Sequence, residues 1–263
     1  MSDRPTRASP SQIKSNGPVT YVDMAEGVVD PNLLQSFVNL YDETFTDPTE
    51  REDPLQWSQR LSGPKSLNPR THLLVALAST DDPPDIIGGL MFEYYRESGC
   101  GLLTYLVVAT RHRNRGVARE LVSRARAILE QDAALAECSL EAVFAETEDP
   151  AQVDAGSTSM DPNRRLAALY GLGGRWIDIP YVQPELQRGI GRSRHLLLVA
   201  MCPTASAKES DSISGQVLRA FLDEYYRSLG VSNPAEDVDF AAMSKGIGRS
   251  LELKDLRERV CNV

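Results

Sequence analysis

Residues 102–122 read LLTYLVVATRHRNRGVARELV, and this stretch decides the fold class. The apolar run at 102–109 is typical of a buried strand, and a basic loop follows it. After Gly116, apolar residues recur at helical spacing, which predicts an amphipathic helix that continues to about Ala134. The sequence therefore predicts a strand, a basic loop and a helix in direct succession.

Apolar segments on both sides of this unit extend the pattern. Residues 72–78 and 86–95 predict two strands that form an antiparallel meander with the strand at 102–109, and the prolines in 81–85 predict a turn. Further strands are expected at 19–23, 140–146, 176–182 and 195–201, and helices at 54–61, at 162–172 and from Asp30-Pro31 onward. This order predicts an α/β fold whose mixed, mostly antiparallel sheet has a central parallel strand pair flanked by helices.

The chain divides into three parts by composition. Residues 1–18 are polar and predict a disordered tail, and 19–203 carry the expected sheet. Residues 204–263 begin with TASAKESDS, a linker, and continue as a C-terminal helical extension. Its first helix, 214–229, has an apolar face that must pack on its own domain, on a second subunit in a homodimer, or over a substrate cleft.

Bulk composition excludes several classes of protein. A net charge of −9 argues against a nucleic-acid binder, and no apolar run is long enough to span a membrane. The first residues lack the apolar core of a secretory signal, so we expect a cytoplasmic protein whose four cysteines are reduced. The three histidines lie far apart in the sequence and no Cys/His cluster has metal-ligand spacing, so no metal is expected.

The basic loop has the chemistry of a diphosphate site. A helix start offers unpaired backbone N–H groups and a positive dipole end. Gly116 allows close approach of a phosphate, and Ala118 keeps the next turn small. Arg111, Arg115 and Arg119 could add charge-assisted contacts.

The segment 113–118, RNRGVA, resembles the Arg/Gln-x-x-Gly-x-Gly/Ala signature of the GNAT acyltransferase superfamily. A second resemblance lies at 163–174, NRRLAALYGLGG, where Asn163, Tyr170 and Gly174 have the spacing of a late GNAT helix. Arg175 stands where the family usually has an aromatic residue. Together the two signatures make 19–203 similar to a GNAT domain.

The resemblance implies an N-acyltransferase, most simply an acetyltransferase, that moves an acyl group from acetyl-CoA or another acyl-CoA to an amine in a ternary complex. The amine acceptor would be a small molecule or a protein. Tyr170 would protonate the leaving thiolate, and a backbone N–H of Val107 or Val108 would polarise the thioester. The implied coenzyme contacts are Leu106, Val107, Val108, Arg111, Arg113, Asn114, Arg115, Gly116, Val117, Ala118 and Asn163.

The general base is where the chain departs from the family. Many relatives have a glutamate nine or eleven residues before the signature arginine, but Thr104 and Leu102 stand there. Glu146 is the expected substitute, with Glu93 as the alternative, and an acidic edge here could also attract a cationic amine. The missing glutamate also leaves open a non-catalytic acyl-CoA sensor or interaction module.

Overall fold

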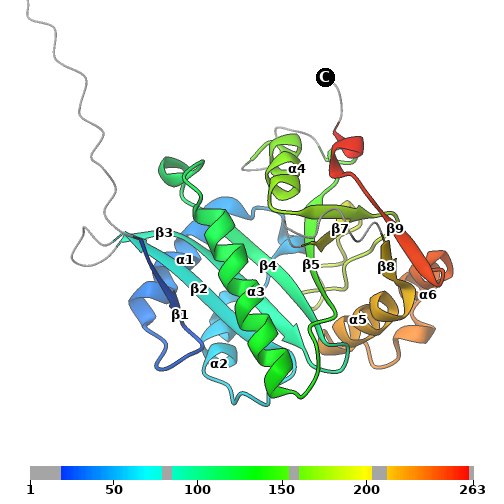
Figure 1. The fold of residues 1–263 in the computed structure, drawn as a ribbon, viewed down its shortest axis with the longest axis horizontal. Helices are drawn as coiled ribbons and strands as arrows, with labels where there is room; N and C mark the ends of the chain where they lie inside the picture. Colours follow the sequence, from blue (N-terminus) through cyan, green and yellow to red (C-terminus); the bar gives the residue numbers. More distant parts are fainter. Residues whose placement is uncertain (1–18, 79–84, 154–159, 203–211, 261–263) are drawn as a thin grey trace, which may run out of the picture.

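The computed structural model describes residues 19–78, 85–153, 160–202 and 212–260, and within them nine strands form one mixed sheet (Figure 1). The strands are β1 (Val19–Asp23), β2 (Arg70–Ala78), β3 (Asp85–Tyr95), β4 (Cys100–Val108), β5 (Ala142–Glu148), β6 (Gly174–Ile177), β7 (Leu196–Met201), β8 (Ser212–Ser214) and β9 (Ser250–Lys254). Their order across the sheet is β1-β2-β3-β4-β5-β7-β6-β9-β8.

Only the central pair β4–β5 is parallel among the strand pairs of the described residues, and the other pairs are antiparallel. The predicted fold class is confirmed, including the meander β2-β3-β4 and the central parallel pair.

The α-helices are α1 (Pro31–Thr44), α2 (Trp57–Leu61), α3 (Val117–Leu135), α4 (Pro162–Gly171), α5 (Gly215–Ser228) and α6 (Val238–Gly246). Short 3₁₀ turns are η1 (Pro48–Glu50), η2 (Pro54–Gln56), η3 (Thr110–His112), η4 (Pro234–Glu236) and η5 (Leu256–Arg259). An Asp-Pro pair begins α1, η1, η2 and α4, because the aspartate accepts from free backbone N–H groups and proline needs none. No helix of the described residues is both long and apolar enough to cross a membrane.

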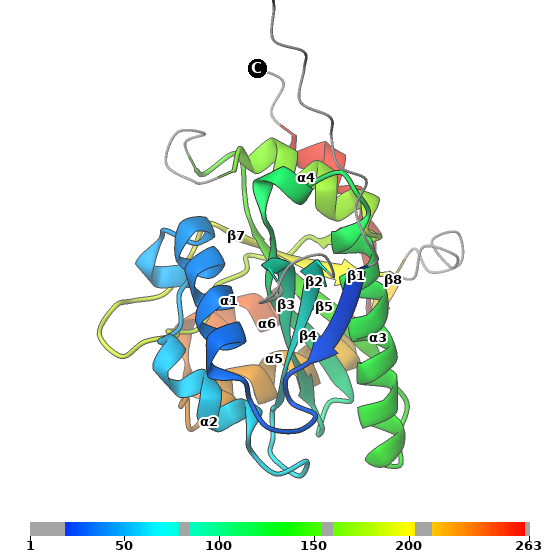
Figure 2. The same ribbon diagram turned by 90° about the vertical axis from the view of Figure 1, so that its left-hand side faces the viewer.

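The helices cover both faces of the sheet. Figure 2 shows α3 on one side and α1 with α2 on the other. Apolar residues of α3, α4 and η5 share a core with one face, whereas α1, α2, α5 and α6 pack on the opposite face. The face of a β4 residue therefore decides which group of helices it meets.

The bounds of several strands differ from the sequence prediction, and β2, β4 and β6 each begin two residues earlier than expected. β5 begins and ends two residues later than the expected 140–146. β6 ends at Ile177, whereas a strand over 176–182 was expected, because the chain then turns tightly. The N–H of Ile179 bonds to Ile177 O, Tyr181 bonds to Ile179 O, and Pro180 has no N–H to donate. The tail expected at 1–18, residues 81–84 of the expected turn and most of the expected linker lie outside the described residues.

The segment after residue 212 packs on the rest of the chain. Leu218, Phe221 and Leu222 of α5 are fully buried, and Phe221 stacks on Phe144 of β5 with ring centroids 4.3 Å apart. The segment contains two strands besides the expected helices, and β9 pairs with β6. The apolar face of α5 is thus covered by its own sheet.

Candidate active site

The two central strands part at one end. Their parallel pairing runs from Cys100↔Ala142 to Leu103↔Ala145 and stops there, although β4 continues for five residues. A β-bulge lies at the same place, because Met91 pairs with Tyr105 while Phe92 pairs with Leu103. Thr104 is the extra residue, and its hydroxyl donates to Met91 O at 2.9 Å. The bulge turns β4 away from β5 and leaves one edge of residues 104–108 without a strand partner in this sheet.

A cavity of about 1390 Å³ occupies this opening. It is lined by the diverging ends of β4 and β5 and by parts of α3 and α4. On the opposite face of the sheet, its walls come from residues near η1 and η2, from the loop after residue 182 and from the end of α5. One cavity therefore connects the expected coenzyme loop with the other face of the sheet.

The coenzyme end is built around the start of α3. Gly116 caps this helix with a φ of +82°, and Asn114 has a φ of +60°. A Cβ added to Gly116 would meet no atom within 4 Å, so the space above it is open. Within the described residues, no backbone acceptor is recorded for the N–H groups of Gly116, Val117 and Ala118. They are the free donors that an anion at a helix start would need.

Most of the predicted coenzyme contacts line the cavity. They are Leu106, Val107, Val108, Arg113, Asn114, Gly116, Val117 and Ala118. Arg113 also donates from Nε to Val108 O at 3.1 Å, which ties the loop to the strand. Arg111, Arg115 and Asn163 are not among the lining residues. The guanidinium of Arg111 instead pairs with Asp85 and donates to His112 Nε2 at 3.0 Å.

Two cationic lining residues on α4 were not predicted. Arg164 and Arg165 line the cavity together with Arg119, which the sequence did suggest. Arg165 also pairs with Glu148 at the end of β5, with Nη1 and Oε2 2.7 Å apart. The sequence offered one indication that these arginines belong to the site. Both lie on the helix that carries the second signature, and residues three or four apart on a helix share one face.

Tyr170 is not among the residues that line the cavity, whereas its neighbours Leu169 and Gly171 are. The ring of Tyr170 packs between two cations, with the guanidinium carbons of Arg257 and Arg175 4.3 and 5.1 Å from its centroid. The role of Tyr170 as proton donor stays a prediction that this position does not support.

Glu146 lies in the cavity on β5, as predicted. Tyr181 donates to its Oε1, and Gln183 Nε2 donates to Oε2 at 2.9 Å. Burial raises the pKa of Glu146 to about 7, although the bonds from Tyr181 and Gln183 lower it, and the charge of Glu50 raises it further. A carboxyl group with this pKa can accept a proton near neutral pH.

Glu93, the alternative base, is held in an ion pair. The guanidinium of Arg60 lies between Glu93 and Glu52 and bonds to both. Glu93 also accepts from Tyr95 OH at 2.6 Å and from Thr71 Oγ1 at 3.2 Å. Its carboxylate lines the cavity and is engaged by the cation of Arg60, whereas the hydrogen-bond donors to Glu146 are uncharged.

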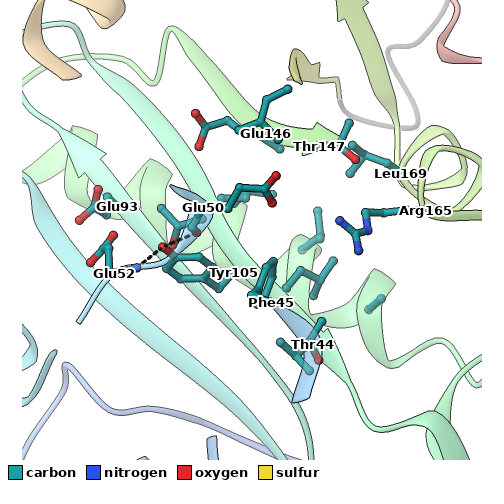
Figure 3. A pocket seen from close by; sticks show the side chains of 18 of the residues that line it. Thr44, Phe45, Glu50, Glu52, Glu93, Tyr105, Glu146, Thr147, Arg165 and Leu169 are labelled. Atoms are coloured by element: carbon teal, nitrogen blue, oxygen red, sulfur yellow. Dashed lines mark hydrogen bonds between the residues drawn. The ribbon is translucent and has the colours of Figure 1, made fainter. Parts of the chain in front are cut away.

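A third carboxylate cluster was not visible in the sequence. His195 Nε2 lies 2.7 Å from Glu50 Oε1 and 3.4 Å from Asp47 Oδ2, and the bond from Glu50 raises the pKa of His195. Three such groups could hold a metal ion, although a protonated His195 satisfies both carboxylates equally well. Residues 47 and 195 are distant in sequence, so only the fold brings them together. Figure 3 shows Glu50 close to Glu146, with the carboxylate of Glu50 directed toward the side of Arg165 and that of Glu146 directed away from it.

The comparisons with known proteins agree with this geometry. Residues 34–153 match the model of the acetyltransferase (GNAT) family. The matched residues include β4, the basic loop, α3 and Glu146, so the resemblance inferred from the sequence is confirmed. A search of curated proteins finds no significant match.

Several solved structures are distantly similar. A protein assigned to the GNAT family from Bacteroides thetaiotaomicron is 17% identical, with 80% of this chain and 98% of that chain covered and a TM-score of 0.46. The ribosomal-protein-S18-alanine N-acetyltransferase from Escherichia coli is 10% identical, with coverages of 69% and 93% and a TM-score of 0.41. IAA acetyltransferase from Bacillus cereus ATCC 14579 is 16% identical, with coverages of 70% and 99% and a TM-score of 0.41. At this distance the activity in each name belongs to that protein alone.

Proposed function

We propose that this protein is an acyl-CoA-dependent N-acyltransferase that transfers an acyl group, most simply acetyl, directly to an amine. The observation that carries the proposal is the position of Glu146. It shares one cavity with the opened edge of β4 and the free helix start at Gly116. A group that can bind a CoA thioester and a group that can deprotonate an amine thus meet in one space.

The coenzyme would bind across the start of α3. Its diphosphate would accept from the N–H groups of Gly116, Val117 and Ala118, with charge from Arg119 and Arg164 nearby. The pantetheine arm would follow residues 104–108, where one edge of β4 lacks a strand partner in the sheet. In this arrangement a backbone N–H of Val107 or Val108 would donate to the thioester oxygen.

The reaction forms a C–N bond and breaks the C–S bond of the thioester. An ammonium group must lose one proton before its nitrogen can attack, and Glu146 as carboxylate accepts that proton directly or through water. The nitrogen loses its second proton as the amide forms, and the departing thiolate takes up one proton to become CoA thiol. No step in this balance requires the hydroxyl of Tyr170.

The second candidate is a protein that binds acyl-CoA without turning it over. The position of Tyr170 outside the cavity favours it, because the family's usual proton donor is then missing from the site. The pKa of Glu146 favours catalysis, since a purely structural carboxyl gains nothing from being held near neutrality.

Two measurements separate these candidates. Calorimetry with CoA tests the binding site, and release of CoA thiol from acetyl-CoA in the presence of an amine panel tests turnover. We expect binding and amine-dependent thiol release. Binding without release from any amine would support the sensor, and absence of CoA binding would refute both proposals.

A further inference from the structure

The cavity beyond Glu146 is lined by more acidic than basic groups. Arg60 is shared between Glu52 and Glu93, and His195 is shared between Glu50 and Asp47. Five acidic residues line this end of the cavity, Glu50, Glu52, Asp53, Glu93 and Glu146, whereas the arginines that line it there among the described residues are Arg60 and Arg188. This end of the cavity has unbalanced negative charge in a buried setting, where such charge is costly without a cation.

One buried oxygen points independently to a donor ligand. Gln183 lines the cavity and is 4% exposed. Its Oε1 has no hydrogen-bond partner among the described residues. Gln183 uses its amide nitrogen on Glu146, so its free oxygen lies beside the candidate base. A ligand with several N–H groups would satisfy such an oxygen.

A row of hydroxyl groups and aromatic rings joins Glu146 to Glu93. The hydroxyl of Tyr225 lies 3.4 Å from Glu146 Oε1, and the ring of Tyr225 lies 5.9 Å from the ring of Tyr95. Tyr95 in turn donates to Glu93. Glu146 and Glu93 therefore lie at opposite ends of this row, and both line the cavity. A chain with a cation at each end could meet both carboxylates.

This end of the cavity is also partly covered. Gln187 Nε2 in the loop after residue 182 donates to Arg51 O at 2.8 Å, which ties that loop to the segment between η1 and η2. Ser228 and Leu229 at the end of α5 form another wall. A folded protein needs an open groove to present a lysine or an N-terminus, whereas a small molecule can occupy an enclosed pocket.

We propose that the acceptor is a small linear amine carrying at least two positive charges, with its reacting nitrogen at Glu146 and its second cation toward Glu52 and Glu93. The inference rests on the proposed acyltransferase function and adds the substrate class. A monoamine of equal length would leave Glu52 and Glu93 to share the single charge of Arg60 and would bind less well.

The test compares diaminobutane with butylamine as acceptors for the full-length protein and acetyl-CoA. We expect kcat/KM for diaminobutane to be higher by about tenfold or more, as one additional charged contact supplies. Glu52→Gln should raise KM for diaminobutane several-fold and leave KM for butylamine unchanged. Glu236→Gln, which removes an exposed carboxylate of η4, is the matched control and should change neither.

A second measurement is independent of turnover. Calorimetric titration of the CoA-bound protein with diaminobutane should give binding that Glu52→Gln weakens and that salt reduces. Equal kcat/KM for both amines, or better acylation of a peptide with only an N-terminal charge, would overturn the dication proposal while leaving acyl transfer intact. Failure to bind CoA and to acylate any amine would instead overturn the acyltransferase function, and this proposal with it.

Discussion

The hydroxyl of Tyr225 on α5 donates a hydrogen bond to Glu146 on β5 over 3.4 Å. Tyr181 and Gln183 donate to the same carboxyl group. All three donors lie beyond residues 34–153, the part that matches the GNAT family model. The family domain therefore contributes the candidate base, while later segments of the chain set its environment.

Gly116 gives the sharpest test of the coenzyme site. Gly116→Leu should reduce CoA affinity at least tenfold, because a side chain would fill the open space above the helix start. Calorimetry measures the affinity. Gly230→Leu is the matched control, since Gly230 also has a positive φ (+90°) and open space but does not line the cavity. Both variants should lose similar stability, about 1–2 kcal/mol. Equal CoA affinity in the two would remove the assignment.

Glu146→Gln should lower kcat by about 10²–10⁴-fold if the carboxylate accepts the amine proton. In the unmodified protein, kcat/KM should rise as pH passes about 7, where Glu146 ionises, and the variant should lose this inflection. Glu141→Gln, just before β5 and exposed, is the control. A large loss from Glu93→Gln with none from Glu146→Gln would move the role to Glu93.

Glu146 should also have a measurable effect on stability. Its folded pKa of about 7 lies above its ordinary 4.5, so the folded state holds the proton more tightly than the unfolded state. The contribution is fully present below pH 4.5 and is lost as pH rises to about 7, by at most about 3 kcal/mol. Denaturant unfolding of both proteins at several pH values measures it. A gap between unmodified protein and Glu146→Gln that does not change with pH would contradict the pKa.

Two tyrosine variants test whether the position of a side chain in the structure or the family resemblance predicts its role in catalysis. Tyr170→Phe should leave kcat within about twofold, because its ring lies between arginines outside the cavity. Tyr225→Phe should shift the pH inflection upward, because its hydroxyl lowers the pKa of Glu146. Steady-state pH profiles measure both. A hundredfold loss in Tyr170→Phe would restore it as the proton donor.

A truncation after Pro203 should fail to fold stably. It removes Leu218, Phe221 and Leu222, each worth about 1.5–3 kcal/mol of burial, and uncovers Phe144 on β5. Near-ultraviolet circular dichroism and CoA calorimetry on the truncated chain test this. A folded, CoA-binding truncated protein would show that the C-terminal segment is a separate appendage.

Much of the fold could be predicted because periodicity is local. The meander and α3 follow from residues within each segment, and the Asp-Pro pairs mark helix starts. The short strand β9 could not be predicted, since SLELK becomes a strand by pairing with β6 and β8. Strand propensity alone predicts poorly where pairing with a distant segment determines whether a strand forms.

The site was predictable in part for the same reason. Gly116 and its flanking residues form a contiguous motif, whereas the contacts of Glu146 come from Tyr181, Gln183 and Tyr225. The role of Tyr170 was inferred from spacing within one helix and stays a prediction. The direction of that side chain depends on Arg257, far along the chain, which packs on its ring.

The pairing of Trp176 with Lys254 has a consequence for biosynthesis. Strands β1 to β4 can associate once the first half of the chain has left the ribosome, because their contacts are close in sequence. β6 must wait for β9, the last strand of the described residues, and until then its backbone edge has no neighbour on that side. The nascent protein thus carries this open sheet edge from the synthesis of β6 until β9 has been made, a period in which chaperones would be its natural protection.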